Sequence, residues 1–184
     1  RLNATAFYSD YSDKREDVIQ ADDTGAVGTV VLNASDVEIS GLEIELTALL
    51  TEQLTTFANF GYIDSAYSSF DADLVGDGVV TDNSDLELRN TPEYTAQLGG
   101  TWVQPVSIGE LAFNYNYYWR DSYQTIFQND PLGEVDAGGF HNASIDLAFM
   151  ENYRISVFGR NLGDERYARV VLIPPVSTFG QWNE

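Results

Sequence analysis

The 184-residue sequence predicts an all-β fold, in which about seven antiparallel strands form an up-and-down meander in the wall of a transmembrane β-barrel. Two observations predict this fold. Apolar and polar residues alternate with a period of two in most segments, and long connections alternate with short ones along the chain. A period of two gives each strand one dry face and one wet face. The 43% hydrophobic content also excludes a disordered acidic chain.

The alternation is clearest in Leu42–Ala48, where every even position is apolar and every odd position is polar. Segment 54–62 is also strand-like, although both of its faces are mixed. The same alternation predicts the remaining strands at 2–8, 94–102, 111–119, 143–149 and 153–157. All of them are expected to share one apolar side.

The connections segregate by length. Long ones are predicted at 12–28, 64–90, 121–141 and from 161 onward, and shorter ones at 51–53, 104–109 and 150–152. All tight turns therefore lie at one end of the meander, as in outer-membrane barrels, which have short periplasmic turns and long external loops. Two aromatic girdles are expected, with one set of rings beside the short turns and another near a long loop. Their members are Trp102, Phe149 and Tyr153, and Tyr117 and Trp119.

In such a barrel the dry face contacts lipid and the wet face lines the lumen. Two alternatives stay open. A soluble, lipocalin-like or sandwich protein that binds a ligand would bury the dry face in a core. A small complete barrel of about eight strands with a structural or adhesion role fits the length, but it needs pairing between the first and last strands.

Composition narrows the function. With 9 Lys+Arg against 29 Asp+Glu, the net charge of −20 excludes a nucleic-acid surface. Zero Cys and a single His, His141, exclude thiolate chemistry and zinc sites. Because no Gly-x-Ser-x-Gly turn accompanies His141, no enzymatic activity is expected.

Four short motifs carry a family resemblance. Asn161–Tyr167, directly after the strand that ends at Arg160, reads Asn-Leu-Gly-Asp-Glu-Arg-Tyr. It resembles the Asn-Leu-x-Asp-x-x-Tyr pattern near the C-terminal end of TonB-dependent outer-membrane receptors. Arg1–Tyr8 resembles a late barrel strand of that family, Gly41–Glu43 its recurrent Gly-apolar-Glu strand start, and Asn90–Pro92 the residues before a descending strand. The motifs follow one another in the family's order over nearly the whole chain.

The resemblance implies that residues 1–184 are a C-terminal segment of a barrel of roughly 22 strands, with no second domain and without the plug and the last strand. It implies a place in the bacterial outer membrane. It further implies energised uptake of a scarce solute, such as an iron–siderophore complex, cobalamin or an oligosaccharide. The expected partners are the TonB complex, through segments outside this chain, together with outer-membrane lipid, lipopolysaccharide and the cargo.

Two groups of residues are candidates for contact with a solute. Charged residues at wet positions are expected to face the lumen, because Arg or Lys at the bilayer midplane costs about 2–4 kcal/mol. They are Glu43, Glu45, Asp146, Arg154 and Arg160. External residues are candidate ligand contacts because aromatic rings stack on planar or sugar-like solutes, although the same rings equally serve to pack loops together. They are Arg120, Tyr123, Phe127 and His141.

The acidic loop 71–87 partly follows a calcium-binding pattern, including its turn glycine. The candidate ligands are Asp73, Asp77, Thr81 and Ser84. The loop departs from the pattern because Val75 has no side-chain oxygen and Ser84 replaces the bidentate Glu. The alternative is a solvated acidic surface loop. Calcium is the one cofactor that the sequence suggests.

Overall fold

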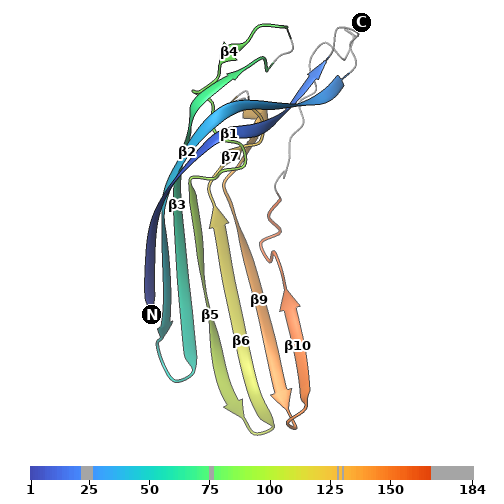
Figure 1. Cartoon of the computed structure of the whole chain (residues 1–184). Coiled ribbons are helices and arrows are strands. Elements are labelled where there is room, and N and C mark those ends of the chain that lie inside the picture. The colour runs from blue at the N-terminus through green and yellow to red at the C-terminus, as the bar shows by residue number, and fades with distance from the viewer. Residues whose placement is uncertain (22–26, 75–76, 128, 130, 167–184) are drawn as a thin grey trace, which may run out of the picture.

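A computed structural model describes residues 1–21, 27–74, 77–127, 129 and 131–166 (Figure 1). Its main sheet is an antiparallel meander, in which each long strand pairs with the next one along the chain. The strands are β1 (Leu2–Ala21), β2 (Val27–Leu49), β3 (Leu54–Ala72), β5 (Tyr94–Val106), β6 (Gly109–Arg120), β9 (Gly138–Phe149) and β10 (Tyr153–Gly159). This confirms the predicted all-β meander.

Short elements occupy the external connections. β4 (Thr81–Asp82) pairs with the end of β3, and β7 (Tyr123–Gln124) pairs with β8 (Glu134–Val135). One turn of 3-10 helix, η1 (Pro131–Gly133), precedes β8. Across the described segments, no helix is long and apolar enough to cross a membrane.

The tight turns lie together at the lower end of the sheet in Figure 1. The connection predicted at 104–109 is shorter than expected, because β5 runs to Val106 and β6 begins at Gly109. In the turn between β9 and β10, Met150 and Glu151 adopt φ angles of 50° and 60°. Positive φ at two successive residues of this three-residue turn suits a tight hairpin connection between right-twisted strands.

The long connection predicted over 12–28 is wrong, because β1 continues to Ala21 and β2 begins at Val27. The pairing of β1 with β2 shifts register around Lys14, and Asp13 adopts a φ of 56°. This bulge breaks the period of two, so the sequence loses its strand signal there. β3 likewise extends into the predicted 64–90 connection, as far as Ala72. Gly41 lies inside β2 rather than at its start.

One face of the sheet, called here the outer face, is apolar across every strand. Leu46 pairs with Leu2 on one side and with Ala58 on the other, and Ala58 pairs with Leu98. In the described part of the chain no second layer covers these residues: Leu46 is 44% exposed and Leu98 is 49% exposed. A soluble ligand-binding protein would bury this face, so the structure contradicts that alternative.

The two edges of the sheet argue against the small complete barrel. Closure requires the first and last strands to pair. Within the described ranges, β1 pairs only with β2 and β10 pairs only with β9. The described residues therefore form an open, curved wall (Figure 1).

Aromatic pairs lie at both ends of the outer face. Near the tight turns, Trp102 stacks on Phe113 with a 5.4 Å centroid distance. Phe149 stacks on Tyr153 at 5.6 Å. At the opposite end of the apolar stretch, the rings of Tyr62 and Tyr94 lie 5.2 Å apart. This arrangement matches the aromatic girdles that flank the apolar band of outer-membrane barrels.

The buried core of the described residues lies at the external end, rather than in the middle of the sheet. It packs the upper parts of β1, β2 and β3 against the loops that follow β3 and β6. Its members are Val18, Val37, Tyr67, Phe70, Ala72, Leu88 and Phe127. Val37 is on the same side of β2 as Glu43 and Glu45, so this core lies on the face opposite the outer face, called here the inner face.

Candidate functional site

The inner face carries a row of polar side chains across four strands. Thr101 of β5 donates to Asn114 of β6 at 2.8 Å. The Asn114 amide nitrogen donates to Ser144 at 3.0 Å and to Asp146 at 2.8 Å, both in β9. Ser156 of β10 donates to the other oxygen of Asp146. This row ties neighbouring strands together through side chains as well as through the backbone.

Beside this row the inner face has a recess of about 440 Å³. It is lined by amides, by two phenylalanine rings and by one guanidinium. The amide of Asn142 donates to the Asn116 oxygen at 3.5 Å, and Phe57 and Phe158 contribute the rings. The guanidinium of Arg160 lies 5.7 Å from the Phe158 ring centroid. Such a surface offers hydrogen-bond donors beside flat apolar faces.

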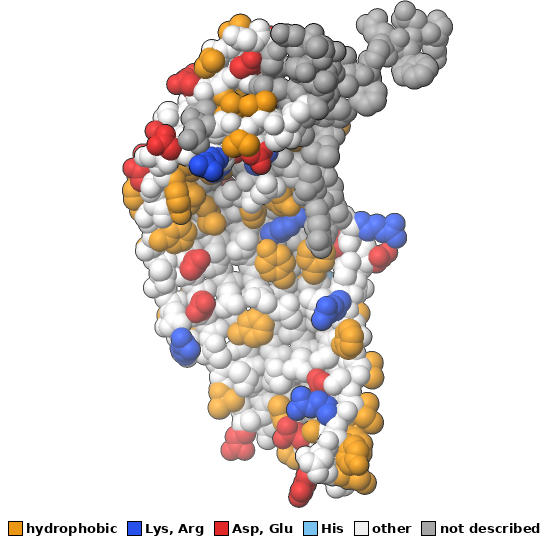
Figure 2. Space-filling model, turned by 45° about the vertical axis from the view of Figure 1, so that its right-hand side comes forward, with side chains coloured by type: hydrophobic (Ala, Val, Ile, Leu, Met, Phe, Trp, Pro, Cys, Tyr) orange, Lys and Arg blue, Asp and Glu red, His pale blue; other side chains and the backbone are white. Residues whose placement is uncertain are grey.

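The charged residues expected to face the lumen all lie on this inner face. Glu45 accepts a hydrogen bond from Asn3 at 2.9 Å, and Glu43 pairs with Thr5 in the β1–β2 ladder. Asp146 belongs to the polar row. Arg154 alternates with the outer-face residues of β10, and Arg160, which directly follows β10, lines the inner recess. Figure 2 shows one face of the wall, where Lys, Arg, Asp and Glu side chains are spread over its length.

Of the four candidate ligand contacts, the structure brings only Arg120 and Tyr123 together. The Arg120 guanidinium lies 4.6 Å from the Tyr123 ring centroid and donates to the carbonyl of Asp121 at 3.2 Å. Phe127 is only 5% exposed and packs the loops together, which was the alternative role for these rings.

His141 lies on the outer face because it pairs with Tyr117 in the β6–β9 ladder. Its Nδ1 is 2.8 Å from the hydroxyl oxygen of Tyr115, and its ring is 4.5 Å from that of Tyr117. His141 is thus separated by the sheet from the recess and from Arg160. The alternation of the strand, rather than the nearby loop, decides its side.

In the acidic loop, carboxylates bind backbone groups. The N–H of Gly78 donates to Asp73 at 2.8 Å, and that of Val79 donates to Asp77 at 2.9 Å. The Thr81 hydroxyl donates to the Ala72 carbonyl at 3.3 Å, and Ser84 N–H donates to Asp82. The described residues hold no group of three His, Cys, Asp or Glu side chains that could bind a metal. Calcium binding by this loop stays a prediction.

A charged cluster around the buried side chain of Glu16, called here the Glu16 anchor, lies at the external end and was not predicted from the sequence. It consists of Lys14, Glu16, Tyr67, Arg89 and Phe127. Burial pushes the Glu16 pKa up, but hydrogen bonds from Lys14, Tyr67 and Arg89 outweigh it and hold the pKa below its ordinary value. Burial and the bond to Glu16 raise the pKa of the Tyr67 hydroxyl. The members of the Glu16 anchor are spread from residue 14 to residue 127, so no local sequence pattern could have predicted the cluster.

The Asn161 motif closes the described part of the chain as a turn. Asn161 adopts a φ of 49°, and its N–H donates to Asn142 of β9 at 3.0 Å. Its side chain donates to the Glu165 carbonyl at 2.9 Å and accepts the Glu165 N–H at 3.0 Å. Leu162 N–H donates to the His141 carbonyl, which continues the β9 ladder by one bond. The Tyr that ends the motif lies outside the described residues.

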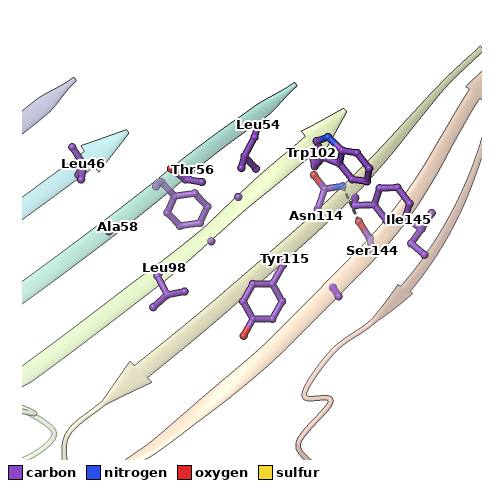
Figure 3. Close-up of a pocket in the computed structure, with 15 residues that line it drawn as sticks. Leu46, Leu54, Thr56, Ala58, Leu98, Trp102, Asn114, Tyr115, Ser144 and Ile145 are labelled. Atoms are coloured by element: carbon purple, nitrogen blue, oxygen red, sulfur yellow. Dashed lines mark hydrogen bonds between the residues drawn. The ribbon is translucent and has the colours of Figure 1, made fainter. Parts of the chain in front are cut away.

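A second hollow lies on the outer face over Gly100, with a volume of about 770 Å³ (Figure 3). The side chains of Leu98, Trp102 and Tyr115 border it. Most of its lining side chains are apolar, although Asn114 and Ser144 of the polar row also border it, so it offers few contacts for a polar solute.

These features define a class of protein: a piece of transmembrane β-barrel wall with an apolar outside, a polar inside and external loops folded inward. The family model described as TonB dependent receptor-like, beta-barrel, matches residues 1–162. The chain therefore belongs to this receptor family, and membership places it in the bacterial outer membrane.

Two solved structures share the fold. The ferric yersiniabactin uptake receptor FyuA from Yersinia pestis has a TM-score of 0.71 at 18% identity, over 90% of this chain and 23% of that chain. The siderophore receptor PiuA from Acinetobacter baumannii has a TM-score of 0.62 at 22% identity, over 90% of this chain and 22% of that chain. This chain thus spans less than a quarter of the length of either protein.

Proposed function

We propose that the chain is part of the wall of an active transporter that captures an iron–siderophore complex on its external loops and imports it. The observation that carries this proposal is the position of those loops. Loop residues Leu88 and Phe127 are buried against the inner face of β1–β3, at the external end of the wall. A solute that enters the lumen from outside must pass this surface.

The two structural neighbours support the cargo, since one is named a ferric yersiniabactin uptake receptor and the other a siderophore receptor. The inner recess also suits an oxygen-rich, partly aromatic solute, because it combines Arg160 and amides with two Phe rings. Cobalamin and an oligosaccharide are the alternative cargoes. The energy source that family membership suggests is the TonB complex, and the expected lipid partners are outer-membrane phospholipid and lipopolysaccharide.

Binding by the full-length receptor in detergent tests the cargo. Ferric yersiniabactin, a ferric catecholate, a ferric hydroxamate, cyanocobalamin and a maltooligosaccharide are titrated separately, with tryptophan fluorescence as the readout. One ferric siderophore is expected to bind, and its metal-free form more weakly. Binding of cyanocobalamin or the oligosaccharide alone would overturn the siderophore assignment.

Uptake in cells tests the energy source. Cells that carry the receptor are expected to accumulate the bound ferric siderophore only when TonB is present. Replacement of loop residues 123–135 by a Gly-Ser linker is expected to abolish binding while the barrel still inserts. Equal uptake with and without TonB would contradict the proposed coupling.

A further inference from the structure

The side chain of Glu16 is a buried acid that the wall does not need for its own pairing. It lies in the external part of β1 and is 2% exposed. The Tyr67 hydroxyl of β3 donates to one carboxylate oxygen at 2.8 Å, and the Arg89 guanidinium donates to the other at 3.1 Å. Lys14 also contacts it. The carboxylate thus joins two wall strands and one loop.

Arg89 continues this connection into a second loop. Its guanidinium lies 3.7 Å from the centroid of the Phe127 ring, which is 5% exposed. Phe127 in turn lies 5.5 Å from Phe70 of β3. Arg89 is therefore held between a wall carboxylate and a loop ring, a geometry that favours a cation over an aromatic face.

Two hydrogen bonds from backbone N–H groups join the two loops into one unit, one to a backbone carbonyl and one to a side chain. The N–H of Asn90 donates to the Gln124 carbonyl at 2.8 Å, and that of Glu87 donates to the Asn129 side chain at 3.2 Å. Thr125 N–H closes the second loop on the Gly133 carbonyl at 2.9 Å. This unit contacts β1 through the ion pair of Glu16 and Arg89, and through the apolar core that holds Val18, Leu88 and Phe127.

The Glu16 side chain is buried and that of Arg89 is 26% exposed. Removal of one partner is unfavourable, because it leaves the other charge in a largely desolvated place without compensation. Without the Glu16 carboxylate, Arg89 gains by moving into water, and it would carry loop 83–92 with it. Phe127 would then lose the cation on its face, so loop 121–137 would loosen as well. The wall strands keep their backbone pairing throughout.

We propose that Glu16 is a positioning residue that fixes two external loops, 83–92 and the described residues of 121–137, as one unit against the inner wall. The inference rests on the proposed function for what those loops do, since it describes how the solute-capturing surface is held in place. It adds that the two loops are released together when the carboxylate is neutralised.

Hydrogen exchange of the full-length receptor in detergent tests this inference without any solute. In Glu16→Gln, exchange of the Asn90 and Thr125 amides is expected to accelerate by about tenfold or more, as for loss of buried charge-assisted hydrogen bonds. Amides of β5 and β6 are expected to keep their wild-type rates. Asp17→Asn is the matched control, because it makes the same charge change at the next residue of β1, which is exposed.

Two further variants test the inference independently of Glu16→Gln. Arg89→Gln removes the pair from the loop side and is expected to release the same two loops, even if Glu16→Gln folds poorly. Glu16→Asp keeps a carboxylate and is expected to restore part of the protection. Loop exchange within twofold of wild type in both Glu16→Gln and Arg89→Gln would overturn the inference, as would release of only one loop. Neither result depends on which solute binds.

Discussion

The membrane part and the external part of this wall are formed by the same strands, but their apolar residues lie on opposite faces of the sheet. In β2, the apolar residues Leu42, Ile44 and Leu46 point to the outer face. Only a few residues higher, Val37 and Ile39 point to the inner face, and Val37 is completely buried. The β1–β2 pairing runs without a shift from Leu46 to Val37. The surroundings, not a change in the backbone, therefore explain the inversion.

The reason is the medium on each side. Around the lower strands, hydrocarbon covers the outer face and polar groups remain inside. Above the lipid, water covers the outer face, and the loops fold over the inner face to supply an apolar core. Between Gly41 and Ser40, the apolar residues of β2 change from the outer face to the inner face. We infer that this position marks the upper limit of the membrane band. The sequence carries this change, because the apolar residues of β2 are at even positions from 42 to 46 and at odd positions at 37 and 39.

The largest expected effect is confined to the external core. Phe70 is fully buried there, so Phe70→Ala is expected to destabilise this region by about 3–5 kcal/mol. Limited proteolysis of the full-length receptor should then cut the loops while the barrel still inserts. Phe60→Ala, on the 40%-exposed outer-face ring, should leave the loops resistant. Loss of insertion in Phe70→Ala would contradict the separation of the two regions.

The next effect belongs to the membrane part. Ile44→Arg places a charge in hydrocarbon, which costs about 2–4 kcal/mol. The variant should therefore sharply reduce the amount of folded receptor in outer-membrane fractions. The neighbouring Glu45→Arg, on the inner face, should be milder. Folded receptor is measured by the heat-dependent shift in gel mobility. Equal losses on both faces would show that the outer face does not contact lipid.

A smaller effect is expected at the boundary itself. A Cβ on Gly41 would lie 2.5 Å from the Phe7 ring and 2.5 Å from the Tyr62 carbonyl oxygen. Gly41→Ala should therefore destabilise the wall by about 1–3 kcal/mol. Gly28→Ala is the matched control, because nothing lies within 4 Å of its Cβ position. The midpoint of thermal unfolding in detergent measures both, and similar midpoints would remove the close approach as the reason for this glycine.

Acid should weaken the external part before the membrane part. The groups that face Glu16 are Lys14, Tyr67 and Arg89, and they hold its pKa below the ordinary glutamate value. Its contribution to stability is therefore present above about pH 4.3 and is lost as the pH falls through the lowered pKa. Loop proteolysis by an acid-active protease should rise below that pH in wild type. In Glu16→Gln, loop cleavage should already be high at neutral pH and should depend less on pH than in wild type. The same pH dependence of cleavage in wild type and Glu16→Gln would contradict this prediction.

Calcium should have the smallest effect. If the 71–87 loop binds it with an affinity typical of extracellular sites, a concentration equal to Kd stabilises the loop by about 0.4 kcal/mol. Calorimetry of the full-length receptor at millimolar calcium should give a heat that Asp73→Asn with Asp77→Asn removes. Absence of heat in wild type would end the calcium prediction.

Local sequence patterns predicted the strands well in the membrane part, where lipid covers the whole outer face. The alternation of Leu42–Ala48 and of 111–119 found β2 and β6, and the Asn161 motif marked the end of β10. The prediction of a long connection over 12–28 was wrong for two reasons. A bulge at Lys14 shifts the period of two, and the polar residues of this segment suit a strand pair that lies in water. Likewise, proximity to a long loop suggested a ligand role for His141, whereas its ladder position assigns it to the outer face.

By itself, the sequence determined the sidedness of the membrane strands, the class of fold and the family resemblance, because these depend on periods of two and on short motifs. Only the tertiary structure decided where the external loops lie and which buried acid holds them. Glu16, Tyr67, Arg89 and Phe127 are far apart in the chain, and their contact follows from strand register, a bulge and loop packing together. Long-range burial of this kind leaves no periodic trace in a sequence.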